Sequence, residues 1–359
     1  MKKELILIFG GRSGEHEVSL RSAASVYNHL HKEKYSVTLI GIADDGKWFL
    51  QDNPEESQDS LAIDTSEERT VGIVPMKGFS CGNRIIRADV VFPLIHGTFG
   101  EDGTLQGLLE MGGFPYIGAT VGGSYMGMDK DVSKSIWTSH EIDVVPYTAI
   151  RKWQYEKDKQ NEVNSNLIET HGLPLFVKPS MAGSSVGVSK VDSAEQLADG
   201  MMKAFSFDTK VIVEPAISGR EVECSVIGNI ETESFPPGEV APTHDFYDYE
   251  AKYIDPDGAG LIIPAELPDQ LTNELRSIAE KAYKVLELKG FARVDFFIEE
   301  NTGRILLNEV NTIPGFTNIS MFSMMCAVGG LPYTKLLDRL VELAEEQFAE
   351  RAKLKYSYE

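Results

Sequence analysis

The chain has 359 residues and a formal net charge of −21, with 42% hydrophobic and 25% charged residues. This length allows two or three domains with substantial cores, and the composition is ordinary for a globular enzyme. The negative charge disfavours nucleic-acid binding, because phosphate backbones would be repelled. The same field would repel ATP, so an ATP site on this chain needs local lysines and a metal ion.

The cysteines and the apolar runs favour a cytoplasmic protein. Cys81, Cys224 and Cys326 are widely spaced and show neither a disulfide framework nor a zinc spacing, which fits a reducing compartment. Glu4 and an early glycine pair interrupt the pattern of a signal peptide, and no apolar run approaches the length of a membrane span. We therefore expect no membrane or nucleic-acid partner.

The N-terminal third predicts an open α/β sheet, with a hairpin near Asp45 and a surface loop or short helix over the acidic stretch 52–70. The expected strands are 4–11, 36–42 and 88–95, and the expected helices are 17–30 and 104–111. Open α/β sheets bind ligands at the carboxyl ends of their strands, where Glu15 and His96 fall. Taken singly, Glu15 also fits a helix N-terminus and His96 a core position. The glycines after the first strand do not match the dinucleotide fingerprint, which disfavours a dehydrogenase.

The middle of the chain predicts a helix over 123–140, which carries Lys130, and then a second α/β unit over 147–216. That unit is expected to run strand, polar helix, strand, glycine loop, strand, helix, strand. Lys178 precedes the loop Gly183-Ser184-Ser185. A Walker loop has its lysine after the glycines and opens a helix, so this loop is of another kind. It could fold over phosphates and offer backbone N–H groups, or be a plain hairpin turn.

The last part of the chain predicts a long loop, two helices and a hairpin. The loop 246–260 mixes tyrosines, acids and Lys252, a composition typical of a lid or a site lining. Helices are expected over 268–288 and 332–350, with a loop over 312–329.

The hairpin is expected over 293–315, with its turn around Asn301 and Gly303. If Phe297 pairs near Ile305, Arg293 lies opposite Glu309. Alternation then gives one polar face and one apolar face. The polar face is expected to hold Arg293, Asp295, Leu307, Glu309 and Asn311, and the apolar face Val294, Phe296, Ile298, Leu306 and Val310.

The polar face of this hairpin suggests a metal site. Two carboxylates and an amide oxygen, with phosphates completing the shell, suit Mg²⁺. The alternative is a structural Arg293–Glu309 ion pair on a solvated face.

Two segments resemble the signature segments of the D-alanine–D-alanine ligases, members of the ATP-grasp superfamily. They are 96–107, which reads His-Gly-Thr-Phe-Gly-Glu-Asp-Gly-Thr-Leu-Gln-Gly, and 293–315. The similarity spans essentially the whole chain. It implies a mixed α/β (α+β) fold with three-domain ATP-grasp architecture. The N-terminal α/β substrate-binding domain would be 1–122, the central ATP-grasp domain with the glycine-rich loop 123–216, and the C-terminal domain with metal site and lid 217–359, with ATP between the last two.

The resemblance also implies a reaction: ATP-dependent ligation of two D-alanines through an acyl phosphate, for peptidoglycan precursor synthesis. The alternative is a sister enzyme that takes D-lactate or D-serine as second substrate. Tyr253 resembles the tyrosine of dipeptide-forming members, whereas depsipeptide-forming members have a histidine in a different loop. A non-catalytic nucleotide-binding protein would not need the whole set of acids and lysines.

Residue roles for the amino-acid substrates follow from the same resemblance. Glu15 would bind the ammonium of the first D-alanine, with His96 nearby. Arg293 would stabilise the acyl phosphate and the oxyanion. Ser184 and Tyr253 would close the loop over the site and link to Glu15. The second carboxylate would be received by Ser320 and the Gly315 backbone.

Roles for ATP and metal are implied in the same way. Phosphates would be bound by Lys130, Lys178 and Lys252, the adenine amino group by Glu214 and the ribose by Glu221. Further nucleotide contacts would fall on Ser185, Ala216, Ile217, Asn308 and Glu309. Two Mg²⁺ ions, with Mn²⁺ as an alternative, would be held by Asp295, Glu309 and Asn311, and the family suggests a homodimer. The chain departs from the family pattern at Pro215, Met181-Ala182 and Ile319.

Overall fold

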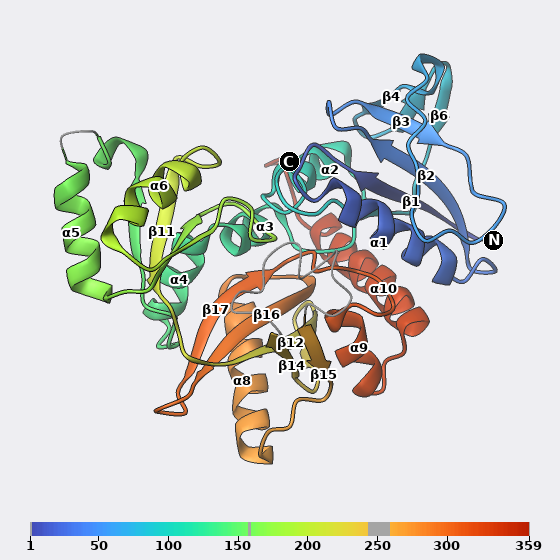
Figure 1. The fold of residues 1–359 in the computed structure, drawn as a ribbon. Helices are drawn as coiled ribbons and strands as arrows, with labels where there is room; N and C mark the ends of the chain where they lie inside the picture. Colours follow the sequence, from blue (N-terminus) through green and yellow to red (C-terminus); the bar gives the residue numbers. More distant parts are fainter. Residues whose placement is uncertain (1, 157–158, 243–258, 359) are drawn as a thin grey trace.

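The computed structural model describes residues 2–156, 159–242 and 259–358, arranged in the lobes of Figure 1. Lys252, Tyr253 and most of the expected lid loop lie outside these residues. Within the described part, no helix combines the length and apolarity needed to cross a bilayer.

The N-terminal sheet is built on a buried apolar strand. β1 (Lys3–Gly10) pairs in parallel with β2 (Tyr35–Ile42) and β7 (Val90–Pro93), and β3 (Trp48–Gln51) adds antiparallel to β2. The helices α1 (His16–His29) and α2 (Thr104–Gly112) follow β1 and β7 in the chain. Each of these elements was predicted. A small antiparallel sheet was not predicted, and it consists of β4 (Val71–Val74), β5 (Gly78–Cys81) and β6 (Arg84–Ile86). The short helix η1 (Glu67–Arg69) before it lies in the stretch 52–70, which was predicted as a surface loop or short helix.

The prediction of one helix over 123–140 is wrong, because the chain forms two helices there, α3 (Val121–Met128) and α4 (Lys130–Ser139), which are separated by Asp129. Asp129 has extended backbone, and its carboxylate accepts hydrogen bonds from the backbone N–H groups of Asp131 and Val132. Aspartate in this conformation caps a new helix rather than continuing the old one.

The central sheet follows the predicted order of elements and is antiparallel throughout, in the order β10-β9-β11-β8. The strands are β8 (Thr148–Arg151), β9 (Leu175–Pro179), β10 (Ser189–Val191) and β11 (Lys210–Pro215), and the helices are η2 (Lys152–Gln154), α5 (Gln160–His171) and α6 (Ala194–Ala204). This lobe has its own core, which includes Leu175, Val177 and Leu197.

The C-terminal sheet has the strand order β15-β14-β12-β16-β17, with β13 paired to β12. Its strands are β12 (Gly219–Gly228), β13 (Thr232–Ser234), β14 (Gly238–Pro242), β15 (Ala259–Ile262), β16 (Gly290–Glu299) and β17 (Ile305–Asn311). Helix α8 (Asp269–Val285) packs on one face and shares a core with Val222 and Val294. The predicted loop 312–329 is partly wrong, because α9 (Met321–Val328) lies inside it; its apolar residues leave no amphipathic pattern to read. Helix α10 (Tyr333–Ala352) follows.

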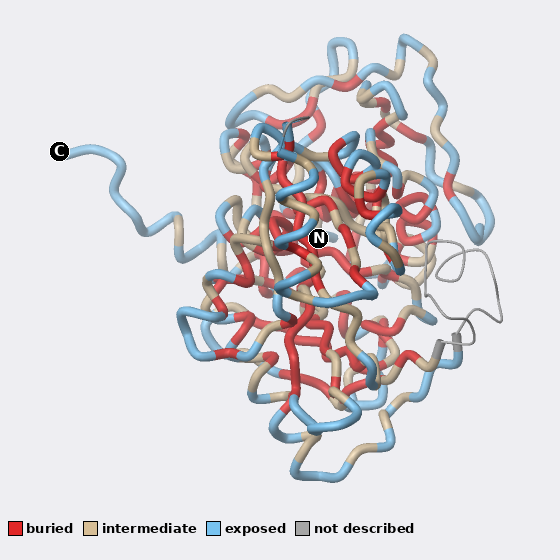
Figure 2. Tube along the Cα trace, turned by 60° about the vertical axis from the view of Figure 1, so that its left-hand side comes forward, coloured by how far each residue is buried: buried red, intermediate tan, exposed pale blue. Residues whose placement is uncertain are grey.

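The N-terminal and C-terminal sheets share one core. Phe92 of β7 packs edge-on against Phe291 and Phe316, with ring centroids 6.4 and 5.6 Å apart. Figure 2 shows buried segments gathered in the interior of the molecule, whereas the C-terminal tail is exposed. Each sheet falls inside one of the ranges 1–122, 123–216 and 217–359, and those boundaries stay a prediction.

Candidate active site

A cavity of about 310 Å³ lies between the loops after β1 and β7 and the polar face of the C-terminal sheet. It is lined by predicted site residues from distant parts of the chain: Glu15, His96, Ser184, Arg293, Glu309, Asn311, Gly315 and Ser320. Glu15 and His96 therefore lie together at the carboxyl ends of β1 and β7, where the open-sheet rule places a ligand, and their binding roles stay a prediction.

His96 lies in the wall of this cavity and is buried. Its Nδ1 is 2.7 Å from the Ile313 carbonyl oxygen, and its Nε2 is 3.0 Å from Ser22 Oγ. Because a carbonyl only accepts, Nδ1 carries the proton and Nε2 accepts from the Ser22 hydroxyl. Burial lowers the pKa of His96 to about 4, so the ring is neutral at pH 7. His96 thus holds the segment that leads to Gly315.

Glu101 supports the same segment, and sequence reasoning gave it no role. One carboxylate oxygen accepts the Ile313 N–H at 2.7 Å, and the other accepts the Gly97 N–H at 2.8 Å. Burial, and then the nearby negative charge of Glu15, raise the pKa of Glu101 to about 8. Its signal in the sequence is an acid enclosed by the glycines of the first signature segment.

The glycine loop reaches across to Glu15. Ser184 Oγ donates to Glu15 Oε1, the contact that the family resemblance implied. A Cβ atom at Gly183 would lie only 2.9 Å from Glu15 Oε2. Ser184 and Ser185 have φ of +47° and +60°, a region that side-chain-bearing residues rarely adopt. The loop is therefore more than a hairpin turn, since it closes one side of the cavity.

The predicted hairpin is present, but its register is shifted. Arg293 lies opposite Asn311 and Asp295 opposite Glu309, so the predicted Arg293–Glu309 pairing is wrong. A bulge beside Asp295 inserts Asn308 as an extra residue in β17.

The bulge also exchanges two leucines between the faces. Leu307 pairs with Phe296 and joins the core, whereas Leu306 pairs with Phe297. The predicted faces are therefore wrong for these leucines and right for the polar residues Arg293, Asp295, Glu309 and Asn311.

Arg293 is held by two acids. Its Nε and one terminal nitrogen each lie 2.8 Å from an oxygen of Asp295, and Nε is 3.0 Å from Glu223 Oε2. Asn311 Nδ2 donates to the same Asp295 at 2.9 Å. Sequence reasoning missed Glu223, although Glu221 and Glu223 alternate with the core residue Val222 along β12.

The chemistry of this face fits a metal that binds with phosphate. Asp295 and Glu309 are direct cross-strand neighbours, and the Asn311 amide is beside them. No group of three or more His, Cys, Asp or Glu side chains within the described ranges could hold a metal ion. Two carboxylates and an amide suit Mg²⁺ when phosphate or water oxygens complete the shell.

Predicted lysines link this hairpin to the central lobe. Lys130 Nζ donates to the Ala182 carbonyl oxygen at 2.8 Å and lies 3.3 Å from Glu309 Oε2. Lys178 Nζ lies 2.6 Å from Glu214 Oε2 and 3.5 Å from Asn308 Oδ1. This lysine cluster, Lys130 and Lys178, is where a chain of net charge −21 would bind ATP phosphates, and that role stays a prediction.

The remaining predicted nucleotide contacts lie along β11 and β12. Ala216 donates its N–H to the Pro174 carbonyl oxygen at 3.0 Å, and Ile217 beside it is half-buried. Glu221 lies on the same face of β12 as Glu223. Ala216 and Ile217 fall in the connection between β11 and β12, and none of these three residues lines the cavity described above.

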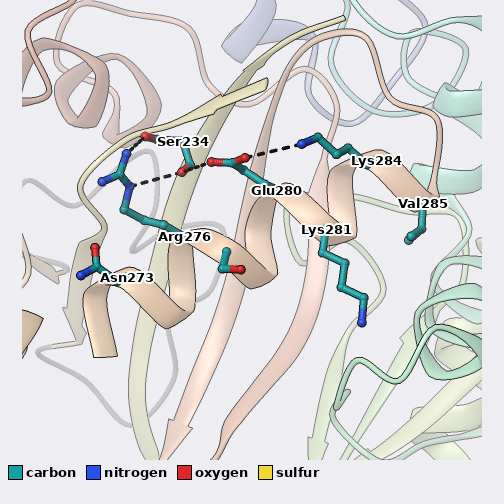
Figure 3. Close-up of a pocket in the computed structure, with 8 residues that line it drawn as sticks. Ser234, Asn273, Arg276, Glu280, Lys281, Lys284 and Val285 are labelled. Atoms are coloured by element: carbon teal, nitrogen blue, oxygen red, sulfur yellow. Dashed lines mark hydrogen bonds and ion pairs between the residues drawn. The ribbon is translucent and has the colours of Figure 1, made fainter. Parts of the chain in front are cut away.

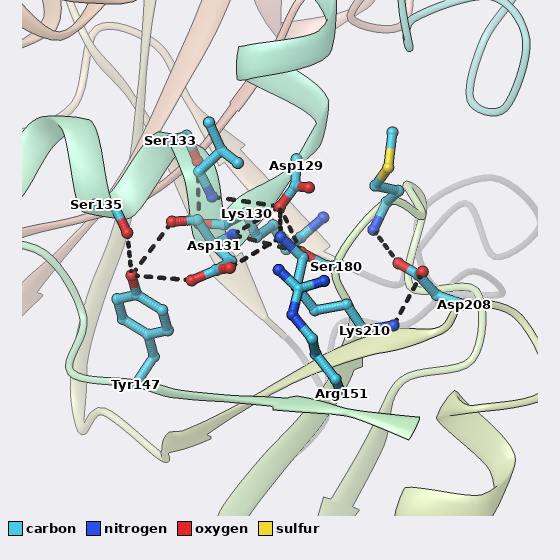
Figure 4. Close-up of polar contacts among 12 residues, drawn as sticks. Asp129, Lys130, Asp131, Ser133, Ser135, Tyr147, Arg151, Ser180, Asp208 and Lys210 are labelled. Carbon is cyan, nitrogen blue, oxygen red and sulfur yellow. Dashed lines mark hydrogen bonds and ion pairs between the residues drawn. The ribbon is translucent and has the colours of Figure 1, made fainter. Parts of the chain in front are cut away.

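A polar network anchors Lys130 and the start of the glycine loop (Figure 4). Asp129 Oδ1 lies 2.7 Å from both Lys210 Nζ and Ser180 Oγ. Lys210 Nζ also lies 2.8 Å from Asp131 Oδ2, and the Lys130 N–H donates to the Ser180 carbonyl oxygen at 3.0 Å. The network therefore joins α4, β11 and the residues after β9.

A second hollow lies along α8 (Figure 3). Three of its charged side chains are linked through Ser234: Arg276 Nε donates to Ser234 Oγ at 3.2 Å, Ser234 Oγ donates to Glu280 at 2.7 Å, and Lys284 lies 3.7 Å from Glu280. Of the described predicted site residues, none lines this hollow.

Solved structures with the same arrangement are ligases. A D-alanine–D-alanine ligase from Coxiella burnetii superposes with a TM-score of 0.86 and 36% identity, covering 98% of this chain and 96% of that one. A D-Ala:D-Ser ligase from Enterococcus faecalis gives a TM-score of 0.82 at 35% identity, covering 96% and 100%. The fold and the site define the chain as an ATP-grasp enzyme.

Sequence comparison narrows this class. Residues 4–119 match the family model of the D-ala D-ala ligase N-terminus, and residues 136–342 that of the C-terminus. A D-alanine–D-alanine ligase of Treponema denticola is 45% identical, covering 98% of each chain. One of Caldicellulosiruptor bescii is 42% identical, covering 100% of this chain and 99% of its own. The chain belongs to the D-alanine–D-alanine ligase family.

Proposed function

We propose that this protein joins two D-alanines to D-alanyl-D-alanine with ATP, as a step of peptidoglycan precursor synthesis. The observation that carries the proposal is the cavity in which Glu15, Arg293 and Ser320 face one space, beside Glu309 and the lysine cluster. An ammonium-binding acid, an oxyanion-binding arginine and a carboxylate-binding serine are what two amino acids need to meet head to tail.

In the first step, a carboxylate oxygen of D-alanine attacks the terminal phosphorus of ATP, giving an acyl phosphate and ADP. Glu15 would hold the ammonium of this D-alanine, while Lys130, Lys178 and Lys252 would bind the phosphates. Magnesium, held by Asp295, Glu309 and Asn311, would neutralise phosphate charge during the transfer.

In the second step, the amine of the second D-alanine attacks the acyl carbon. A C–N bond forms, the C–O bond to phosphate breaks, and inorganic phosphate and a proton leave. Arg293 would stabilise the oxyanion, while Ser320 and the Gly315 N–H would hold the second carboxylate. Closure by Ser184 and Tyr253 would exclude water, because an acyl phosphate hydrolyses readily.

Phosphate release tests the reaction most directly. With ATP and Mg²⁺, D-alanine should give phosphate and ADP in equal amounts, together with D-alanyl-D-alanine, whereas L-alanine should give none. Nucleotide binding without D-alanine-dependent phosphate release would identify a binding protein and refute the enzyme.

The second substrate is the finer question, because one structural relative is a D-Ala:D-Ser ligase. A site discriminates strongly between an amine and a hydroxyl only when it binds that group directly. We expect D-alanyl-D-alanine as the main product when D-alanine competes with excess D-lactate or D-serine near pH 7. Predominant D-alanyl-D-lactate or D-alanyl-D-serine, separated and quantified, would assign the chain to the alternative activity.

We further propose a cytoplasmic homodimer that uses two Mg²⁺ ions, with Mn²⁺ as an alternative. The free thiols of Cys224 and Cys326 are consistent with a reducing compartment. Light scattering of the purified protein tests the dimer, and metal titration of activity after chelation tests the ion.

A further inference from the structure

Lys134 is a fully buried lysine to which the proposed mechanism gives no role. It lies on α4, one turn after Lys130, and is 0% exposed. Its Nζ is 2.8 Å from Glu214 Oε1, while the other oxygen of that carboxylate is 2.6 Å from Lys178 Nζ. One buried acid is therefore shared by two lysines.

The surroundings of Lys134 fix its position. Nζ also donates to the Val145 carbonyl oxygen at 3.3 Å and lies 5.8 Å from the centre of the Tyr147 ring. The Val145 N–H in turn donates to Leu307 of β17 at 3.0 Å. Lys134 is thus tied to the strand that carries Asn308 and Glu309.

Packing alone does not account for a lysine here. Lys134 is fully buried, so its charge is desolvated and its pKa is lowered, and an apolar side chain of similar size would avoid that cost. The partner explains the charge. Burial would raise the pKa of Glu214, but Lys134 and Lys178 outweigh it and hold that pKa below its usual range.

The charge balance shows what Lys134 adds. Lys134, Lys178 and Glu214 together carry a net charge of +1, whereas Lys178 and Glu214 alone would cancel. Lys178 already reaches toward the C-terminal sheet, with Nζ 3.5 Å from Asn308 Oδ1. A nucleotide phosphate would compete with Glu214 for this lysine.

We infer that Lys134 is a positioning residue for nucleotide binding: it neutralises Glu214, so that the charge of Lys178 is available to the phosphates of ATP. The inference rests on the proposed function for the identity of the ligand. It adds a residue that does not line the cavity described above and acts through Glu214 on Lys178.

The experiment compares Lys134→Met and Lys134→Gln in the full chain. Methionine removes both charge and hydrogen bond, while glutamine keeps a donor for Glu214 without the charge. Calorimetry measures the Kd of a non-hydrolysable ATP analogue with Mg²⁺, and steady-state kinetics measure KM for ATP and for D-alanine. We expect both variants to weaken the analogue by about tenfold to a hundredfold, the usual weight of a charge-assisted contact. KM for D-alanine should change less than about twofold.

Thr138→Val is the matched control on α4. It removes the 2.8 Å hydrogen bond from Thr138 Oγ1 to the Lys134 carbonyl oxygen without changing charge, and should leave the analogue Kd unaltered. If Lys134→Met does not fold, Lys134→Gln decides. Wild-type analogue affinity in folded Lys134→Gln overturns the inference and leaves the proposed function intact. Failure of the wild-type protein to bind the analogue would instead remove the proposed function.

Discussion

Glu309 is the residue at which the proposed metal and the lysine cluster meet. It lies opposite Asp295, and its carboxylate is 3.3 Å from Lys130 Nζ. We predict that Glu309→Gln lowers kcat at least about a hundredfold, because one charge-stabilising group is removed from the phosphoryl transfer. The side chain is 25% exposed, so the fold should be kept, as circular dichroism and melting will show.

Glu300→Gln, at the exposed turn of the same hairpin, is the matched control and should retain full activity. A Glu309→Gln enzyme with near-normal kcat at saturating Mg²⁺ would mean that the hairpin acids are structural.

Single residues show which features of the site could be predicted from the sequence. The polar hairpin residues could be read from strand alternation alone, because Arg293, Asp295, Glu309 and Asn311 do share a face. The register could not, because nothing local marks the bulge at Asn308. Buried acids and lysines were missed for a different reason: their partners are distant in sequence. Lys134 and Glu214 are 80 residues apart, and only the fold brings them together.

The glycine loop is the element that links two lobes at the cavity. Gly183 faces Glu15 Oε2 so closely that an added Cβ would lie 2.9 Å away. We predict that Gly183→Ala lowers kcat/KM for D-alanine by about tenfold or more, because either the loop or Glu15 must move. Gly122→Ala on α3, where a Cβ has room, should leave both activity and melting temperature near wild type. Equal kinetics for the two variants would exclude loop closure on Glu15.

Helix α4 depends on Asp129, which sequence reading placed inside one long helix. The carboxylate caps α4 and lies 2.7 Å from the buried Lys210 Nζ. Asp129→Ala leaves that lysine with Asp131 alone, and we predict a loss of about 3 kcal/mol in the free energy of unfolding. Asp192 forms a solvent-exposed ion pair with Lys190, so Asp192→Ala should lower the free energy of unfolding by less than about 1 kcal/mol. Urea unfolding of both variants measures the difference, and equal midpoints would show that the Asp129 network is dispensable.

At the scale of the whole molecule, the order of elements was predictable and their assembly was not. Hydrophobic periodicity and turn residues indicate the N-terminal sheet, the central sheet and the hairpin of the C-terminal sheet, because both signals are local, but they did not indicate the small sheet of β4, β5 and β6. The core shared by the N-terminal and C-terminal sheets is assembled from Phe92, Phe291 and Phe316, which no local pattern connects. The same holds for the cavity, whose walls come from those two sheets and the glycine loop.

The shared core makes stability depend on pH through His96, which joins the N-terminal sheet to the segment after β17. Its pKa is about 4 in the folded chain, below the ordinary 6.5 of an unfolded one. Between these values the unfolded chain binds more protons, so the free energy of unfolding falls as pH drops from 6.5 toward 4. This difference between the folded and unfolded pKa of His96 corresponds to at most about 3 kcal/mol in the free energy of unfolding.

His96→Gln cannot titrate in this range, and its amide can still donate to Ile313. We therefore predict that the free energy of unfolding of the variant is lower than that of the wild type at pH 7. As pH falls to 4.5 the wild type loses the contribution of neutral His96 and the variant does not, so the difference between the two free energies narrows. Urea unfolding of both proteins at several pH values measures the gap. If the free energies of unfolding of the two proteins change with pH in parallel, His96 is already exposed to protons in the folded state. The contact of His96 with Ile313 would then open before the chain unfolds.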